Sequence, residues 1–148
     1  MARMNTALAA NGAEFLVLGR LLIEGIETYK SYVNHPGYDL LAIDPERGRQ
    51  CRISVKSRFA TDFDGGFPVG NLDFDVLVAV ALNRGYRYRK QGTENGLQAP
   101  DLYVLPVTVV QELRREERCW HKVFLRHIDD LDTYRENFEV IRQYLQAT

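Results

Sequence analysis

Apolar residues recur at helical intervals along the first thirty residues of the chain. The stripe consists of Leu8, Phe15, Leu18, Leu22 and Ile26, and it is widened by Leu16, Leu21 and Ile23. This spacing predicts a long amphipathic helix over residues 6–30. Because an amphipathic helix buries its apolar stripe, we expect this face to cover a sheet.

Two short strands are predicted next, at residues 38–43 and 50–56, joined by a turn at residues 44–48 that contains Pro, Gly and Asp. The second strand alternates strictly between apolar and polar residues. Cys51, Ile53 and Val55 share one face, whereas Arg52, Ser54 and Lys56 share the other. The apolar face is therefore expected to point into the core.

The remaining pattern predicts a strand at residues 74–82 that is covered on both faces, and a further strand at residues 102–105. Residues 59–73 and 83–100 are interpreted as loops. A helix over residues 108–118 is expected to start with Thr108 as its N-cap. A strand at residues 122–126 precedes a closing helix from residue 129 or 130. Its expected apolar stripe is Leu131, Tyr134, Phe138, Ile141 and Leu145.

The predicted order is helix, four strands, helix, strand, helix (α-β-β-β-β-α-β-α). This order indicates an α/β or α+β fold with helices on both faces of a mixed β-sheet. A length of 148 residues fits one domain over residues 1–148.

The composition is that of a globular protein, with 45% hydrophobic and 26% charged residues. The sequence contains no uninterrupted apolar run of about 18 residues, so no membrane segment is expected. The two cysteines, Cys51 and Cys119, form no C-x-x-C pair, which favours free thiols in the cytoplasm over a disulfide framework.

Basic residues are concentrated in two segments although the net charge is only −1. Residues 46–58 hold five basic residues and one acid, and residues 84–90 hold four basic residues interleaved with tyrosines. Such segments are typical of loops that bind phosphates and stack on bases, and also of solvated loops and strand edges. The candidate nucleic-acid-binding residues are Arg52, Arg58, Arg84, Arg87, Arg89 and Lys90.

Four residues could form a site if the first helix and the first hairpin pack in sequence order. Glu14 is on the helix, Asp39 starts the first strand, and Ser54 and Lys56 share one face of the second. Each residue alone has an ordinary explanation. Glu14 would face solvent, Asp39 would cap a turn, and Lys56 would be an exposed strand lysine. Their combined order favours a shared pocket.

This order resembles the PD-(D/E)xK nuclease superfamily. The matching segments are Gly12-Ala13-Glu14, Pro36-Gly37-Tyr38-Asp39-Leu40-Leu41 and Ile53-Ser54-Val55-Lys56-Ser57. Their spacing is similar to that of restriction-endonuclease-like proteins and archaeal Holliday-junction resolvases. The resemblance covers about residues 10–58.

The resemblance implies a DNA endonuclease that acts on duplex or branched DNA, often as a homodimer. It implies that Asp39, Glu14 and the backbone carbonyl of Val55 hold Mg²⁺ or Mn²⁺. Lys56 would orient or deprotonate the attacking water, or stabilise the transition state. Phosphodiester hydrolysis uses such an ion to neutralise developing charge and to activate water.

Ser54 departs from the family pattern because it stands where the second acid is expected. A hydroxyl is a weaker ligand for a hard cation than a carboxylate, so the site is expected to bind metal less tightly unless Glu14 replaces the missing acid. Two alternatives follow. The chain could be an inactive nuclease-fold module that binds nucleic acid, or a protein-binding subunit in which Asp39 and Lys56 only form a salt bridge.

Overall fold

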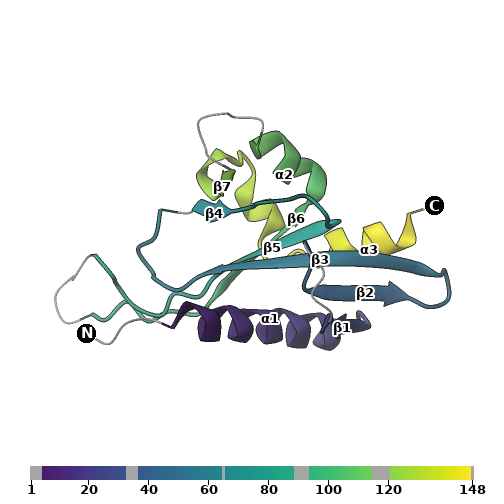
Figure 1. Ribbon diagram of the computed structural model, residues 1–148, viewed down its shortest axis with the longest axis horizontal. Helices are drawn as coiled ribbons and strands as arrows, with labels where there is room; N and C mark the ends of the chain where they lie inside the picture. The colour runs from purple at the N-terminus through teal and green to yellow at the C-terminus, as the bar shows by residue number, and fades with distance from the viewer. Residues whose placement is uncertain (1–4, 33–36, 65, 89–93, 115–120, 148) are drawn as a thin grey trace.

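The structure, a computed structural model, describes residues 5–32, 37–64, 66–88, 94–114 and 121–147 (Figure 1). The helices are α1 (Thr6–Ile23), α2 (Val107–Arg114) and α3 (Glu139–Gln146), with short 3-10 helices η2 (Leu125–His127) and η3 (Leu131–Tyr134). The strands are β1 (Thr28–Lys30), β2 (Leu40–Asp44), β3 (Arg49–Arg58), β4 (Gly66–Pro68), β5 (Val76–Ala81), β6 (Asp101–Pro106) and β7 (Lys122–Phe124).

Five strands form a mixed sheet in the order β1-β2-β3-β5-β6. Strands β3 and β5 are parallel, and the other neighbours are antiparallel. All six residues of β5 are buried, because this strand has a neighbour on each side and a packed layer on each face. The predicted class, a mixed sheet flanked by helices, is confirmed.

The sheet separates two hydrophobic clusters. Helices α1 and α3 pack on one face, against residues that include Ile53, Val78 and Val104. Helix α2 and the β4-β7 pair pack on the other face, against Leu77 and Leu105. Figure 1 shows α1 below the main sheet, and α2, β4 and β7 above it. The predicted alternation of β3 is confirmed, since Cys51, Ile53 and Val55 belong to the first cluster.

The prediction for the first helix was wrong in its end and only partly right in its buried face. The helix ends at Ile23, and Gly25 has a φ of +79°, a left-handed conformation that commonly follows a helix. Part of the predicted stripe faces solvent, because Leu8, Phe15 and Leu22 are 69%, 54% and 51% exposed. The rest was placed correctly, since Leu21 and Ile26 are buried and Leu18 packs against the core. The buried residues are Ala13, Val17 and Leu21. Apolar residues occupy several sides of this helix, so periodicity alone does not select the side that packs.

Helix α1 is also long and apolar enough to cross a membrane, judged by length and composition alone. In the structure, Val17 and Leu21 are fully buried in the core, and Glu14 lines a cleft. That the protein has no membrane segment stays a prediction.

Three further differences concern the second half of the chain. The predicted loop at residues 59–73 contains β4, which pairs with β7 in a separate two-stranded sheet. Helix α2 begins at Val107, so Thr108 lies inside the helix and is not its N-cap; residues 115–118 lie outside the described part. Helix α3 begins only at Glu139, because residues 131–134 form η3.

Candidate active site

The candidate site lies where strand β3 changes partners. It pairs with β2 through residues 49–53 and with β5 through residues 53–58. Asp39, directly before β2, donates its N–H to the Ile53 carbonyl and accepts from the Ser31 N–H (2.8 and 2.9 Å). After Ile53, β3 no longer pairs with β2. The Val55 N–H instead donates to the Asp39 carboxylate, at 2.8 Å from its Oδ2. Asp39 is thus fixed through both its backbone and its side chain.

Gly37 fixes the turn that precedes Asp39. Its φ of +111° is a conformation that L side chains rarely adopt. A Cβ at this position would lie 2.6 Å from the Asn71 Oδ1 and 2.6 Å from the Asp73 Cβ. The turn therefore packs directly on the loop before β5 and accepts only glycine without rearrangement.

The carboxyl groups of Asp39 and Glu14 lie close enough to share a hydrogen bond. Burial raises the pKa of Asp39 above its usual value, the Val55 N–H lowers it, the nearby Glu14 carboxylate raises it, and Lys56 lowers it by a smaller amount. The net result is a raised pKa. Three of the predicted residues, on α1, before β2 and on β3, are thereby brought together.

These residues line a cleft of about 950 Å³. The start of α1, the end of β3 and the segment that follows it form most of the walls. Four basic residues line the cleft: Lys56, Arg58, Arg87 and Lys122. Four acids also line it: Glu14, Asp39, Asp62 and Asp64.

Ser54 and Val55 occupy different places relative to the cleft. Val55 lines it, whereas Ser54 does not and is only 2% exposed. The Ser54 side chain points to the same face as Lys56 but lies deeper, next to Leu77 on β5. The position of the missing acid is therefore sealed beneath the surface.

The donors at this site fit a divalent cation with many water ligands. Mg²⁺ is commonly held by one or two carboxylates and keeps several waters. The Glu14 and Asp39 carboxyls supply two such ligands, and their close approach, which raises the pKa of Asp39, is relieved by positive charge between them. The described residues contain no cluster of three or more His, Cys, Asp or Glu side chains suited to a metal.

A projecting segment, here called the arm (residues 83–88 and 94–98), lies beside the cleft. It leaves the sheet after β5 and reaches the end of the molecule where α1 begins (Figure 1). The Thr61 hydroxyl ties both sides of the arm to the segment after β3. It accepts from the Gly85 N–H at 3.1 Å and donates to the Gly96 carbonyl at 2.6 Å.

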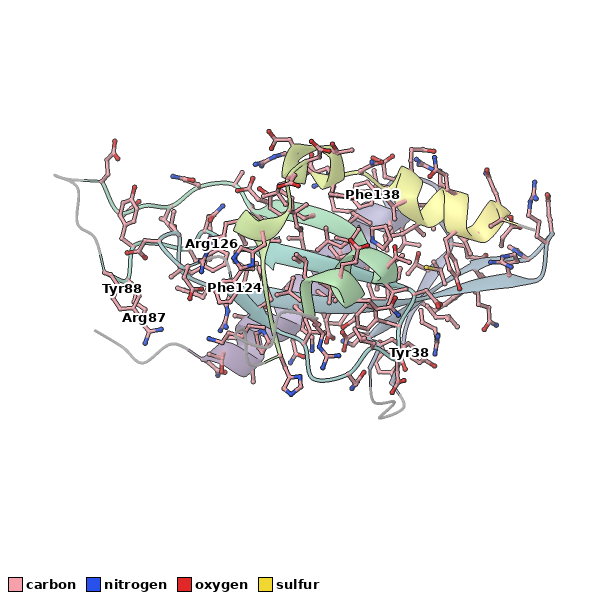
Figure 2. All side chains as sticks on the ribbon, turned by 90° about the horizontal axis from the view of Figure 1, so that it is seen from above. Tyr38, Arg87, Tyr88, Phe124, Arg126 and Phe138 are labelled. Carbon is pink, nitrogen blue, oxygen red and sulfur yellow. The ribbon has the colours of Figure 1, made fainter. Side chains whose placement is uncertain are left out.

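Asp62 fixes the part of the arm that faces the cleft. Its two carboxylate oxygens accept from the backbone N–H groups of Arg87 and Tyr88, each at 2.7 Å. The Arg87 guanidinium lies 5.2 Å from the Tyr88 ring centroid, and Figure 2 shows the two side chains together at one end of the molecule. Although Asp62 lines the cleft, its charge is directed at the backbone of the arm.

The basic residues singled out in the sequence lie in three different settings. Arg58 and Arg87 line the cleft. Arg52 is outside the cleft lining and pairs with Asp75 at 3.2 Å. Arg84 closes the arm by donating to the carbonyls of Leu82 and Gln98 (3.1 and 2.6 Å).

The other two predicted residues, Arg89 and Lys90, lie outside the described residues, as does Cys119. The nucleic-acid-binding role of all six basic residues stays a prediction.

Sequence reasoning missed Lys30, Asp62 and Lys122. The Lys30 side chain forms an ion pair with Glu14, but the predicted helix had absorbed this residue. Gly25, followed by Thr28 and Tyr29, was the available signal for a helix end and a strand. Asp62 and Lys122 depend on contacts between distant segments, for which the sequence carries no local signal.

No protein-family model and no curated protein matches this sequence. Among solved structures, the chain matches a bacterial homing endonuclease, I-Ssp6803I, with a TM-score of 0.61. The match covers 94% of this chain and 93% of that chain. This chain has a nuclease-like fold. At 22% sequence identity, the likeness to this nuclease structure concerns the fold alone.

Proposed function

We propose that the protein is a metal-dependent DNA endonuclease of the PD-(D/E)xK class. One observation carries this proposal: Glu14, Asp39 and Lys56 meet in a single cleft at the point where β2 and β3 part. The similar fold of a homing endonuclease supports DNA as the substrate. The choice of Mg²⁺ or Mn²⁺, a homodimer, a preference for duplex or branched DNA and a cytoplasmic location stay predictions.

The roles of the residues follow from their positions. Asp39 and Glu14 would hold the cation with the Val55 carbonyl, and the Val55 N–H keeps the Asp39 carboxylate oriented. A bound Mg²⁺ would supply Lewis acidity at the phosphate and a lower pKa for attacking water. Lys56 would stabilise negative charge that develops on the phosphoryl group. Arg58, Arg87 and Lys122, around the same cleft, would contact neighbouring backbone phosphates.

Lys56 and Lys122 separate catalysis from binding, because each places one positive charge in the cleft and only Lys56 acts on the pKa of Asp39. Lys56→Met is expected to lower the single-turnover cleavage rate about 10²–10³-fold. Lys122→Met is expected to weaken DNA binding less than about tenfold and to keep the rate at saturation. Cleavage of a labelled duplex in Mg²⁺ and Mn²⁺ measures both, and an unchanged rate in Lys56→Met would contradict the assignment.

The arm provides a test of DNA binding in which removing a negative charge is expected to lower the affinity for DNA. Simple electrostatics predicts that removing an acid from a phosphate-binding cleft strengthens binding. We expect the opposite for Asp62→Ala, about tenfold weaker binding, because the arm loses two anchoring hydrogen bonds and no longer holds Arg87 and Tyr88 at the cleft.

Asp64→Ala is the matched control for this experiment. Asp64 also lines the cleft, but its carboxylate accepts from the Gly66 N–H and not from the arm. We expect this variant to bind as tightly as the wild type or more tightly. Fluorescence anisotropy at fixed salt compares the two, and tighter binding by Asp62→Ala would show that the arm does not contact DNA.

A DNA-binding module without cleavage is the second candidate function. It is favoured by Ser54, which is buried and stands where the second acid of the family pattern is expected. Glu14 and Asp39 then remain as the proposed carboxylate ligands in the cleft. Such a module would bind DNA with the same salt dependence and would show no cleavage in Mg²⁺ or Mn²⁺. The cleavage assay with Lys56→Met therefore also distinguishes these two functions.

A further inference from the structure

Lys30 contacts the candidate site from outside the cleft. It is the last residue of β1 and pairs in register with Leu40, the neighbour of Asp39. Its Nζ donates to the Glu14 Oε2, and the two side chains are only 15% and 19% exposed. The ammonium also lies 4.7 Å from the centroid of the Phe15 ring. Lys30 is thus held on two sides, and it is not among the residues that line the cleft.

The acidic and basic side chains of the site lie in a row. Lys30 pairs with Glu14, Glu14 adjoins Asp39, and Lys56 lies near Asp39. The two acids therefore stand between two ammonium groups before any cation enters. A divalent cation adds two positive charges to this group, and the nearest ammonium groups repel it.

We propose that Lys30 is the counter-ion of the metal-free site: it neutralises Glu14, orients the Glu14 carboxylate toward Asp39, and weakens the binding of a divalent cation. This inference rests on the proposed metal-dependent function. Lys30 is a positioning residue, because it acts through Glu14 and does not reach the cleft.

Two opposing effects decide what happens when the charge of Lys30 is removed. Losing the ion pair frees the Glu14 side chain, and fixing a Glu side chain again costs conformational entropy. Losing the ammonium also removes repulsion between one and two positive charges across a partly buried contact, which acts with a low effective dielectric. We expect the repulsion to be the larger effect.

The first measurement is Mn²⁺ binding by calorimetry in the full chain. Lys30→Met is expected to lower the Kd about tenfold. Lys30→Arg keeps the charge and is expected to stay within about twofold of the wild type. An equal or higher Kd in Lys30→Met would overturn the proposal, since it would mean that Lys30 does not oppose the cation.

The second measurement is urea unfolding without metal, for the wild type, Lys30→Met, Glu14→Gln and the double variant. Lys30→Met is expected to raise the unfolding constant about tenfold, because Glu14 then lacks its ion-pair partner. Glu14→Gln in the same chain is expected to restore most of this loss. Purely additive effects would overturn the counter-ion role.

The two measurements distinguish this proposal from the proposed function. A wild type without Mn²⁺ binding would contradict the proposed function and the effect of Lys30 on the cation, whatever the urea unfolding shows. Wild-type binding with an unchanged Kd in Lys30→Met would leave the proposed function in place and overturn the inference about Lys30.

Discussion

Asp39→Asn is expected to reduce Mg²⁺-dependent cleavage of duplex DNA by at least about 10³-fold, because the proposed metal ligand, with several kcal/mol of charge stabilisation, is lost. The amide oxygen of Asn can still accept from the Val55 N–H, so the turn and the strand ends stay in place. Single-turnover cleavage at saturating protein measures the effect. Cleavage by this variant at the wild-type rate would contradict a catalytic role for Asp39.

The same variant is expected to be more stable than the wild type in EDTA at pH 7. The pKa of Asp39 is raised in the folded protein, mainly by burial and further by Glu14. A raised pKa means that folding favours the protonated acid, so stability falls as pH rises through the folded pKa. Asn is neutral at every pH and avoids this loss. Because Asp39 is only partly buried and water screens its charge, we expect a gain of at most about 1 kcal/mol at neutral pH.

The gain of Asp39→Asn should shrink as pH falls through the folded pKa of Asp39. It should disappear below the unfolded pKa of an aspartate, about 4, where the wild-type carboxyl is protonated in both states. Urea unfolding from pH 3.5 to 8 follows this change. Asp132→Asn is the control, because the Asp132 side chain is 93% exposed. A stability difference that is constant with pH would show that ionisation of Asp39 is not its cause.

Val17→Lys is expected to destabilise the protein by about 3–5 kcal/mol, since it places an unpaired charge in the core. Val17 is fully buried against the sheet. Leu22→Lys is the matched control on the opposite side of α1, where the side chain is 51% exposed. There we expect a change within about 0.5 kcal/mol. Urea unfolding of the pair reports which face of α1 packs, and equal losses would contradict this orientation.

Strands β3 and β5 were predictable because their signals are local, whereas the short β1 and β4 were missed. The strict alternation in residues 50–56 matches the face of β3 that enters the core, and the continuous apolar run after Phe74 matches a strand buried on both faces. The face of α1 was not predictable in this way. Leu8, Phe15 and Leu22 form a good stripe by periodicity, but Ala13, Val17 and Leu21 form another, and the sheet selects between them.

The convergence of Glu14, Asp39 and Lys56 in one cleft was predicted from their combined order along the helix and strands. The network that surrounds them was not. The contact of Lys30 with Glu14 depends on where α1 ends. The anchoring of the arm by Asp62 joins residues that lie 25 and 26 positions apart in the chain.

Gly37 extends the functional region beyond the cleft. Asn71 and Asp73 occupy the space where a Cβ of residue 37 would stand, so the position of the Asp39 backbone depends on residues that do not line the cleft. Bulkier residues at positions 71–73 would displace Asp39, the proposed metal ligand, indirectly. In a mutational scan of cleavage, losses at residues 71–73 would then resemble losses at the catalytic centre, and DNA affinity measured alongside would separate the two causes.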